Sequence, residues 1–216
     1  MNILLSSYDF HEKWAQDVMK PLLRENMKVV VIPFSFDKKE VTKVEEFDLH
    51  YGKNGIHTPY ILRPFHFYGI KDIECIDYFR DNIEIAHKKV LSADIIFLTG
   101  GLPDQYLDRL EEFKLDILIK QSNALIIGAR AGALIQIDHY HITPDDDYPI
   151  YQYQRGLGLV NGFEVEVHYC HSQIQNQGIE RVIKEKGLPT YTIANDGGLV
   201  VEEKIIKPFG NAYLVK

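Results

Sequence analysis

The residues that could do chemistry in this chain centre on one short turn. Residues 128–132, Gly-Ala-Arg-Ala-Gly, have the spacing of a nucleophile elbow, G-x-S-x-G, with Arg130 at the serine position. An apolar run, 124–127, leads into the turn, and a helix-compatible stretch, 131–136, leads out of it. Small residues on both sides of Arg130 allow a sharp turn and close packing of helix against strand. Because a guanidinium stays protonated and has no lone pair to offer, the sequence predicts a catalytic turn that lacks its nucleophile.

Three further segments carry residue types that catalytic sites use. Gly100 and Gly101 lie between an apolar run and a helical pattern, where backbone N–H groups could stabilise an oxyanion. His168 follows the run 165–167, a position that suits a general base, and the acidic run 145–147 (Asp145, Asp146, Asp147) could orient it. Ligands bind at the carboxyl ends of strands in open α/β sheets, so we expect these segments to converge with Arg130 there.

The elements that must position these residues are visible as alternating patterns. Strand-like runs alternate with helical patterns along the chain. The strand-like runs are 3–6, 28–33, 93–98 and 163–167, and the helical patterns are 9–25, 37–51, 76–90, 104–120 and 175–186. Pro21 should kink or split the first helix. The aromatic stretch 52–70 has no clear assignment. Near the end of the chain, short strands are predicted at 192–194, 198–201, 204–206 and 211–215. Alternation of this kind is typical of a mostly parallel, doubly wound α/β sheet. With no linker or repeat, we expect a single domain over residues 1–216.

Composition narrows the classes of function. The formal net charge of −7 disfavours nonspecific binding to nucleic acid. The chain has only two cysteines, Cys75 and Cys170, which is typical of a reducing cytoplasm. The N-terminus enters a strand-like run directly, without the pattern of a signal peptide, and no apolar run approaches the ~20 residues of a membrane span. We therefore expect a cytoplasmic protein that binds neither nucleic acid nor membrane.

The order of these segments resembles the peptidase E (aspartyl dipeptidase) and cyanophycinase family of serine peptidases. The motifs are the paired glycines, the Gly-x-x-Ala-Gly-Ala turn at 128–133, the aspartate loop, Gly-Leu-Gly-Leu at 156–159 and the strand ending in His168-Tyr169, with 193–198 like a late strand-turn of the family. The resemblance runs along the whole chain and is most specific between Phe97 and His171. It implies a three-layer α/β/α sandwich related to class I glutamine amidotransferases. It also implies serine-type hydrolysis of small, often aspartyl, peptides. We expect no cofactor and no metal.

The resemblance assigns roles to residues of this chain. Arg130 stands where the family has its nucleophilic serine, and His168 matches the general base. Asp147 fits the orienting acid best among the three aspartates. Gly101 and Ala131, with Gly100 beside them, would supply the oxyanion N–H groups. The family's aspartyl dipeptidases place an arginine shortly after the catalytic histidine, but residues 172–177 contain none. A preference for N-terminal aspartate is therefore not assumed for this chain.

Two functional readings follow from these residues. In the first, the protein is a pseudoenzyme in which Arg130, near a helix N-terminus, binds a small peptide or an anionic small molecule. An opposing interpretation is that Arg130 folds back to pair with one of the aspartates 145–147. In the second reading, the protein is an active hydrolase of peptides or amides that uses His168 with water, Cys170 or a metal. Cys170 would share a face with His168 if the strand continues, while His139, His141, His168, His171 and the aspartates offer metal-ligand types. A homodimer is possible in either case.

Overall fold

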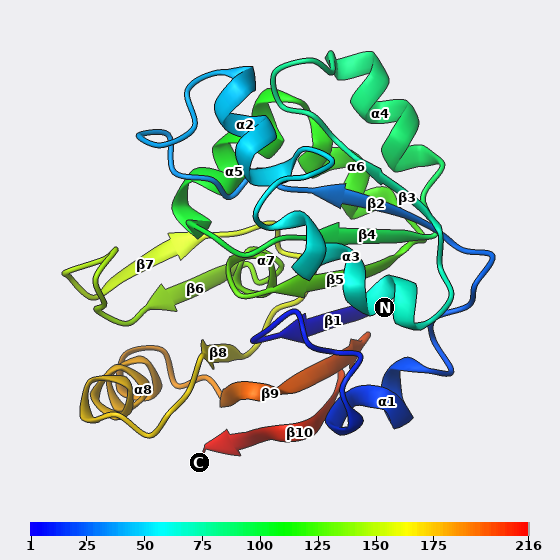
Figure 1. Cartoon of the computed structure of the whole chain (residues 1–216). Helices are drawn as coiled ribbons and strands as arrows, with labels where there is room; N and C mark the ends of the chain where they lie inside the picture. The colour runs from blue at the N-terminus through cyan, green and yellow to red at the C-terminus, as the bar shows by residue number, and fades with distance from the viewer. Residues whose placement is uncertain (216) are drawn as a thin grey trace.

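The computed structural model describes residues 1–215 and is built on an eight-stranded central sheet (Figure 1). Lys216, the last residue of the predicted domain, lies outside the described residues. The strand order is β10-β9-β1-β5-β4-β2-β3, and β8 pairs with one end of β9. The strands are β1 Asn2–Leu5, β2 Lys28–Ile32, β3 Asp72–Cys75, β4 Ile95–Leu98, β5 Leu125–Ala129, β8 Glu164–Val167, β9 Thr190–Glu202 and β10 Ile205–Val215.

Parallel pairing dominates the half of the sheet that carries the predicted site. β1 pairs with β5, β5 with β4, β4 with β2 and β2 with β3, all in parallel. β9 runs antiparallel to β1 and β10 but parallel to β8. The short strands predicted after residue 190 are instead two long ones, because β9 and β10 pair along almost their whole length. The prediction of a mostly parallel α/β sheet is confirmed.

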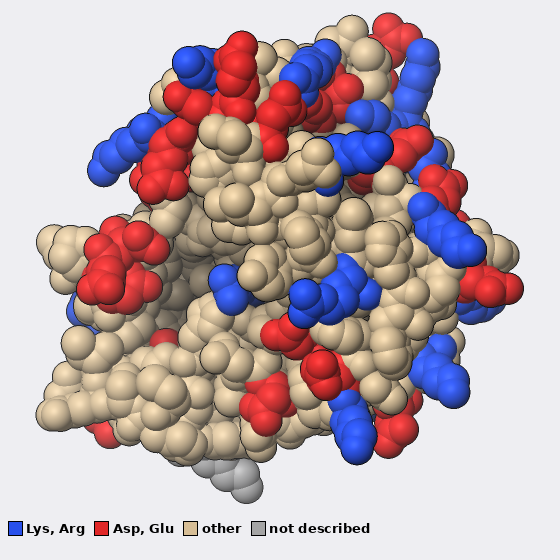
Figure 2. Space-filling view, viewed as in Figure 1, with Lys and Arg blue, Asp and Glu red and all other residues tan. Residues whose placement is uncertain are grey.

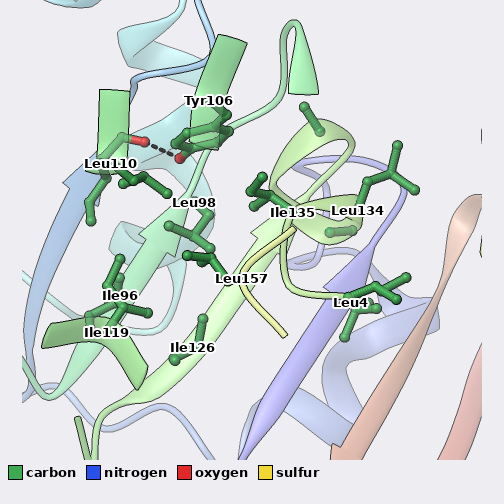
Figure 3. Close-up of a cluster of buried hydrophobic side chains, with 14 of the residues drawn as sticks. Leu4, Ile96, Leu98, Tyr106, Leu110, Ile119, Ile126, Leu134, Ile135 and Leu157 are labelled. Atoms are coloured by element: carbon green, nitrogen blue, oxygen red, sulfur yellow. Dashed lines mark hydrogen bonds between the residues drawn. The ribbon is translucent and has the colours of Figure 1, made fainter. Parts of the chain in front are cut away.

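Alternating side chains of the strands form two cores, one on each face of the sheet. Leu4, Ile96, Leu98 and Ile126 point to one face and pack against residues such as Leu110, Ile119 and Leu134, as Figure 3 shows. Their neighbours Ile3, Ile95, Phe97 and Ile127 point to the other face. Helices α4 Ile83–Leu91, α5 Pro103–Glu112, α6 Leu115–Gln121 and α7 Ala131–Leu134 contribute to the first core, and α1 Lys13–Met19 and α3 Thr58–Phe67 to the second. Helices on both faces give the expected three layers.

Several helices differ from the predicted ranges for local reasons. α1 ends at Met19, ahead of Pro21, because a proline ring cannot follow an α-helical turn without losing a hydrogen bond. The helix predicted over 104–120 is two helices, separated at Lys114, whose φ of 55° is left-handed. The unassigned aromatic stretch contains α3, which tolerates Pro59 in its first turn and carries Pro64 inside. Helix α2 covers Val44–Tyr51 only.

Two elements lie beyond the carboxyl ends of the parallel strands. The first is a hairpin of β6 His139–Ile142 and β7 Gln152–Arg155, and the second is helix α8 Gln173–Lys186. Figure 1 shows both on the left, the side toward which the arrowheads of β1, β4 and β5 point. Among the helices of residues 1–215, none combines the length and apolar character needed to cross a bilayer.

Candidate functional site

The turn that carries Arg130 has the strand–turn–helix form that its spacing predicts. Arg130 links β5 to α7 with φ 57° and ψ −120°, a conformation that side-chain-bearing residues rarely adopt. Its N–H donates a 2.8 Å hydrogen bond to the carbonyl of Leu5, which anchors the turn to β1. A Cβ at Gly132 would lie 2.0 Å from the carbonyl oxygen of Leu98, and one at Gly128 would lie 1.9 Å from the carbonyl oxygen of Gly132. Glycine is therefore required at both positions for the close approach of α7 to β4 and β5.

The Arg130 side chain extends from the turn across Gly100 and is exposed. Its guanidinium carbon lies 5.4 Å from the centre of the Tyr8 ring, within reach of a cation–π attraction. A Cβ at Gly100 would lie 2.6 Å from Cδ of Arg130, so glycine leaves the space that the side chain occupies. Among residues 1–215, no carboxylate lies within 4.0 Å of the guanidinium, and the pairing with an aspartate of 145–147 is not seen. The positive charge is thus available to a ligand.

The paired glycines lie next to this turn, between β4 and α5. Gly101 has φ 147°, and a Cβ there would lie 2.3 Å from the carbonyl oxygen of Ser35. The N–H of Gly100 donates to the Tyr8 hydroxyl at 2.7 Å, so it is already engaged. In the described part of the chain, the N–H groups of Gly101 and Ala131 have no acceptor, and both residues line the cavity described below. These two donors are the ones that remain for a ligand oxygen.

His168 follows the last residue of β8, with φ 53°. Its backbone N–H donates to Oγ of Ser6 at 2.6 Å, and its Nδ1 lies 2.7 Å from Oδ1 of Asn195 on β9. Because an amide oxygen only accepts, Nδ1 carries the proton and Nε2 keeps its lone pair in the neutral ring. Burial lowers the pKa of His168, and the positive charge of Arg130 lowers it further, against the contact with Asn195. The ring is therefore neutral near pH 7 and fixed in orientation.

The aspartate loop connects β6 to β7 and borders the same site. Oδ1 of Asp145 accepts hydrogen bonds from the N–H groups of Asp147 at 3.0 Å and Tyr148 at 2.8 Å, which holds the loop in a turn. Asp145 and Asp147 line the cavity with their side chains exposed, and Asp146 does not line it. Asn195, and none of the three aspartates, is the hydrogen-bond partner of the His168 ring within residues 1–215. The role predicted for Asp147 as the orienting acid stays a prediction.

These segments surround one cavity of about 390 Å³ at the carboxyl ends of the strands. Figure 2 shows this face of the molecule hollowed on its left side, with acidic side chains at the left edge. The cavity contains the predicted residues Gly101, Arg130, Ala131, Asp145, Asp147 and His168, and also His141, Thr143, Tyr148, Glu166 and Gln175. Residues far apart in the sequence therefore meet at the carboxyl ends of the strands, where the sequence predicts that they converge. The volume falls within the range of small-ligand sites, toward its lower end.

A buried ionic network lies against this cavity and joins β6 to β8. His141 approaches two carboxylates, with Nδ1 3.0 Å from Oε2 of Glu164 and Nε2 2.9 Å from Oε2 of Glu166. Glu164 also accepts from Nζ of Lys186 at 2.6 Å. Burial alone would lower the pKa of His141, but the two carboxylates raise it to about 9. Burial likewise opposes ionisation of Glu164, yet hydrogen bonds from His141 and Lys186 hold its pKa below the ordinary value. His141 and Glu164 are thus both ionised at neutral pH.

The structure separates Cys170 from His168. The two would share a face only if β8 continued, but β8 ends at Val167 and both His168 and His171 have left-handed φ values. The Cys170 thiol is exposed, donates to Oε1 of Gln175 at 3.4 Å and lies outside the cavity lining. The cysteine–histidine pair considered as an alternative is therefore not formed within residues 1–215.

The histidines considered as metal ligands are dispersed. His139 contacts Asp138, with Nδ1 3.0 Å from Oδ2, whereas His141 is enclosed by the glutamates. The ring of His171 packs beside Tyr169, at 4.6 Å between centres. Over the described residues 1–215, no group of three or more His, Cys, Asp or Glu side chains is placed to hold a metal ion.

Sequence reasoning missed the roles of Asn195 and of the two glutamates of the network, and it considered His141 only as a metal ligand. The alternation Glu164-Val165-Glu166-Val167 is a signal that could have found the glutamates, because residues two apart on a strand share a face. The resemblance includes residues 193–198, but no local pattern there indicates that Asn195 contacts His168, which lies 27 positions away in the sequence. Only the pairing of β8 with β9 brings the two together.

Comparison with known proteins places this arrangement in a family. Residues 3–208 match the sequence pattern of peptidase family S51. A putative peptidase E protein from Listeria monocytogenes EGD-e has a similar structure, with a TM-score of 0.69, 21% identity and 96% of each chain covered. A peptidase from an acI-B1 Actinobacterium gives a TM-score of 0.65 at 15% identity, over 100% of this chain and 90% of the other. A search of curated proteins gave no match. At these identities the two structures show a shared fold, while the family match covers nearly the whole sequence. The predicted relationship to peptidase E is confirmed at this level, and the chain belongs to peptidase family S51.

Proposed function

We propose that this member of peptidase family S51 is a pseudoenzyme that binds the anionic group of a small ligand and lacks serine-type turnover. The observation that carries the proposal is the guanidinium of Arg130, which extends from the sharp turn beside the cavity with no carboxylate partner in the described chain. A guanidinium presents a planar fork of donors that suits carboxylate or phosphate. The N–H groups of Gly101 and Ala131 would add backbone donors for the same group.

The loss of turnover follows from the chemistry of the side chain at the turn. In a serine peptidase the residue in this conformation attacks the carbonyl, and arginine has no lone pair for that attack. Removing a catalytic serine lowers kcat by a factor of about 10⁶ in a well-studied protease. The remaining features of the turn favour binding of an anion over cleavage of an amide.

A second candidate function is hydrolysis by water that His168 activates. The observation in its favour is the contact of Asn195 with Nδ1 of His168. This contact leaves Nε2 with a lone pair that can accept a proton from water. Arg130 would then stabilise the negative charge that develops on the substrate. We rank this function second because general-base catalysis alone contributes only about 10²–10⁴-fold.

The test compares wild type with Arg130→Ser and Arg130→Ala on a panel of dipeptides that includes Asp-X and isoaspartyl peptides. We expect no hydrolysis by wild type or Arg130→Ala, and measurable hydrolysis by Arg130→Ser, because serine restores a nucleophile to a turn that is already formed. Hydrolysis by wild type that His168→Ala abolishes would overturn the pseudoenzyme and establish the second function.

Anion binding is measured separately by calorimetry with inorganic phosphate and with acetate. Wild type should bind at least one of them, and Arg130→Ala should weaken that binding by about tenfold or more. Arg24→Ala is the matched control, since Arg24 is exposed and lies outside the cavity. Equal loss in both variants, or no binding by wild type, would contradict an anion site at Arg130.

A further inference from the structure

In the network beside the cavity, Oε1 of Glu166 has no hydrogen-bond partner among the described residues 1–215. Oε2 of Glu166 accepts hydrogen bonds from Nε2 of His141 at 2.9 Å and from Oγ1 of Thr143 at 2.6 Å. Oε1 of Glu166 accepts none from residues 1–215, although the side chain is only 8% exposed. This oxygen is not sealed in by protein atoms, and Glu166 lines the cavity. A donor from a ligand or from water must therefore satisfy it, since an unsatisfied carboxylate oxygen is costly.

The Glu166 carboxylate is also held in place. His141 cannot turn away from it, because the other ring nitrogen of His141 faces Glu164, which Lys186 holds in turn. Two donors on Oε2 fix the plane of the carboxylate and hence the direction of Oε1. A fixed acceptor binds a donor without the entropy cost of ordering a free side chain.

The charges that line the cavity have both signs. Arg130 and His141 supply cations, and Asp145, Asp147 and Glu166 supply carboxylates. Both ring nitrogens of His141 already face Glu164 and Glu166, so its charge is directed at Oε2 of Glu166 and not at Oε1. Asp145 and Asp147 are exposed, so solvent and salt screen their charge, whereas Glu166 is buried. An ammonium group has three donors and no acceptor, which matches an unpartnered carboxylate oxygen. A small ligand with one anionic and one ammonium group would be complementary to both Arg130 and Oε1 of Glu166, which line the same cavity.

We propose that Oε1 of Glu166 forms a subsite for the ammonium group of a small zwitterionic ligand whose anionic group binds Arg130. Amino acids and short peptides with a free N-terminus are the ligand class. The inference rests on the proposed function, because Arg130 supplies the anion-binding half. The hydrogen bonds of His141 and Thr143 position Glu166, and the ammonium group replaces water at its free oxygen.

The test uses pairs of ligands that differ only in the ammonium group. Alanyl-alanine and aspartyl-alanine are compared by calorimetry at pH 7 with their N-acetyl derivatives, which keep the carboxylate and lose the ammonium charge. Wild type should bind the better free dipeptide at least about tenfold more tightly than its N-acetyl form. In Glu166→Gln, which keeps the shape of the side chain, the ratio should fall below about threefold.

Glu180→Gln is the control, because Glu180 is exposed on α8 and lies outside this cavity. It should retain the wild-type ratio. If Glu166 had only a structural role, Glu166→Gln would lower the affinity for both members of a pair equally. That result would overturn the subsite. The comparison on wild type is decisive even if Glu166→Gln fails to fold: equal affinity for free and acetylated peptides rejects the inference.

The outcomes also separate the two proposals. Wild type could bind N-acetyl peptides in an Arg130-dependent way without preferring the free amine. That result would support the anion site and reject the ammonium subsite. Binding of neither form by wild type rejects both. Binding that prefers the free amine and survives Arg130→Ala would reject the anion site and retain Glu166 as an ammonium site.

Discussion

His141 and His168 border one cavity, but their neighbours place them in different charge states. His141 faces two carboxylates, which raise its pKa to about 9, so it is a cation at neutral pH. His168 faces an amide oxygen, and burial together with the charge of Arg130 lowers its pKa. At the residue scale, therefore, the partner across the hydrogen bond decides whether a histidine is a fixed charge or a proton acceptor.

Replacing the amide partner should change the titration of His168. In Asn195→Asp, a carboxylate would face Nδ1, and we expect the pKa of His168 to rise by about one unit or more. NMR titration of the histidine ring signals from pH 4 to pH 9 measures this, with Asn161→Asp as a control at an exposed site outside the cavity. An unchanged His168 titration in Asn195→Asp would show that the two side chains do not interact in solution.

The same shift has a consequence for stability. The folded pKa of His168 is lowered, so between the folded and unfolded values the unfolded chain binds more protons. The contribution of His168 to the free energy of unfolding is thus present above about pH 6.5 and is lost as the pH falls through the folded pKa. Asn195→Asp should reduce this loss, which denaturant titrations at pH 5 and pH 7.5 would detect.

At the scale of elements, short turns decide where the functional groups point. The four-residue helix α7 packs close to β4 and β5 because Gly128 and Gly132 leave no Cβ between them. The hairpin β6–β7 places His141 against β8, and α8 places Lys186 against Glu164. Turn residues with left-handed backbone recur at element ends, at Lys114, Arg130 and His168.

Lys114 offers a test of one such turn. Its φ of 55° and ψ of 28° separate α5 from α6, and a residue with a Cβ loses about 1 kcal/mol or more in this conformation. Lys114→Gly should therefore raise the free energy of unfolding by up to about 1 kcal/mol, less the greater entropy of glycine in the unfolded chain. Urea denaturation measures the change. Lys120→Gly, inside α6, is the matched control and should lower stability by about 1 kcal/mol. Destabilisation by Lys114→Gly would contradict the left-handed conformation.

At the scale of the whole molecule, the two cores share the same strands. β4 supplies Ile96 and Leu98 to the core on one face and Ile95 and Phe97 to the core on the opposite face. A disruption of the shared strands would therefore disturb both cores. A single domain over residues 1–216 stays a prediction, and these shared strands make it testable by unfolding. The sheet ends at β10, and the predicted homodimer likewise stays a prediction.

Trp14, the only tryptophan, packs against the core on one face of the sheet, so its fluorescence reports on that core. A substitution in the core on the opposite face then tests whether the two cores unfold together. Leu110 is fully buried in the opposite core, and Leu110→Ala should lower the free energy of unfolding by about 2–5 kcal/mol. If the chain unfolds as one unit, Trp14 fluorescence and far-UV circular dichroism should both record that loss with coincident midpoints. Leu91→Ala is the control, because Leu91 is 72% exposed. A Trp14 transition that Leu110→Ala leaves unmoved would show that the two layers unfold separately.

The sequence by itself determined the class of fold and the composition of the turn. Alternating apolar runs and helical patterns predict a mostly parallel sheet, because burial on both faces requires continuous apolar strands. The spacing of Gly128 and Gly132 predicts the sharp turn at Arg130, because only glycine permits such close backbone contact. The segments that meet at the cavity also follow from the sequence, since parallel strands end at a common edge.

Tertiary structure alone decided which groups pair within that cavity. Asn195 lies beside His168 because β9 pairs with β8. His141 is charged because β6 crosses the glutamates of β8. The Arg130 side chain extends along Gly100 and Tyr8, where it meets no carboxylate of residues 1–215. Hydrogen bonds and charge interactions act over a few ångströms, so they depend on contacts between distant segments that no local pattern encodes.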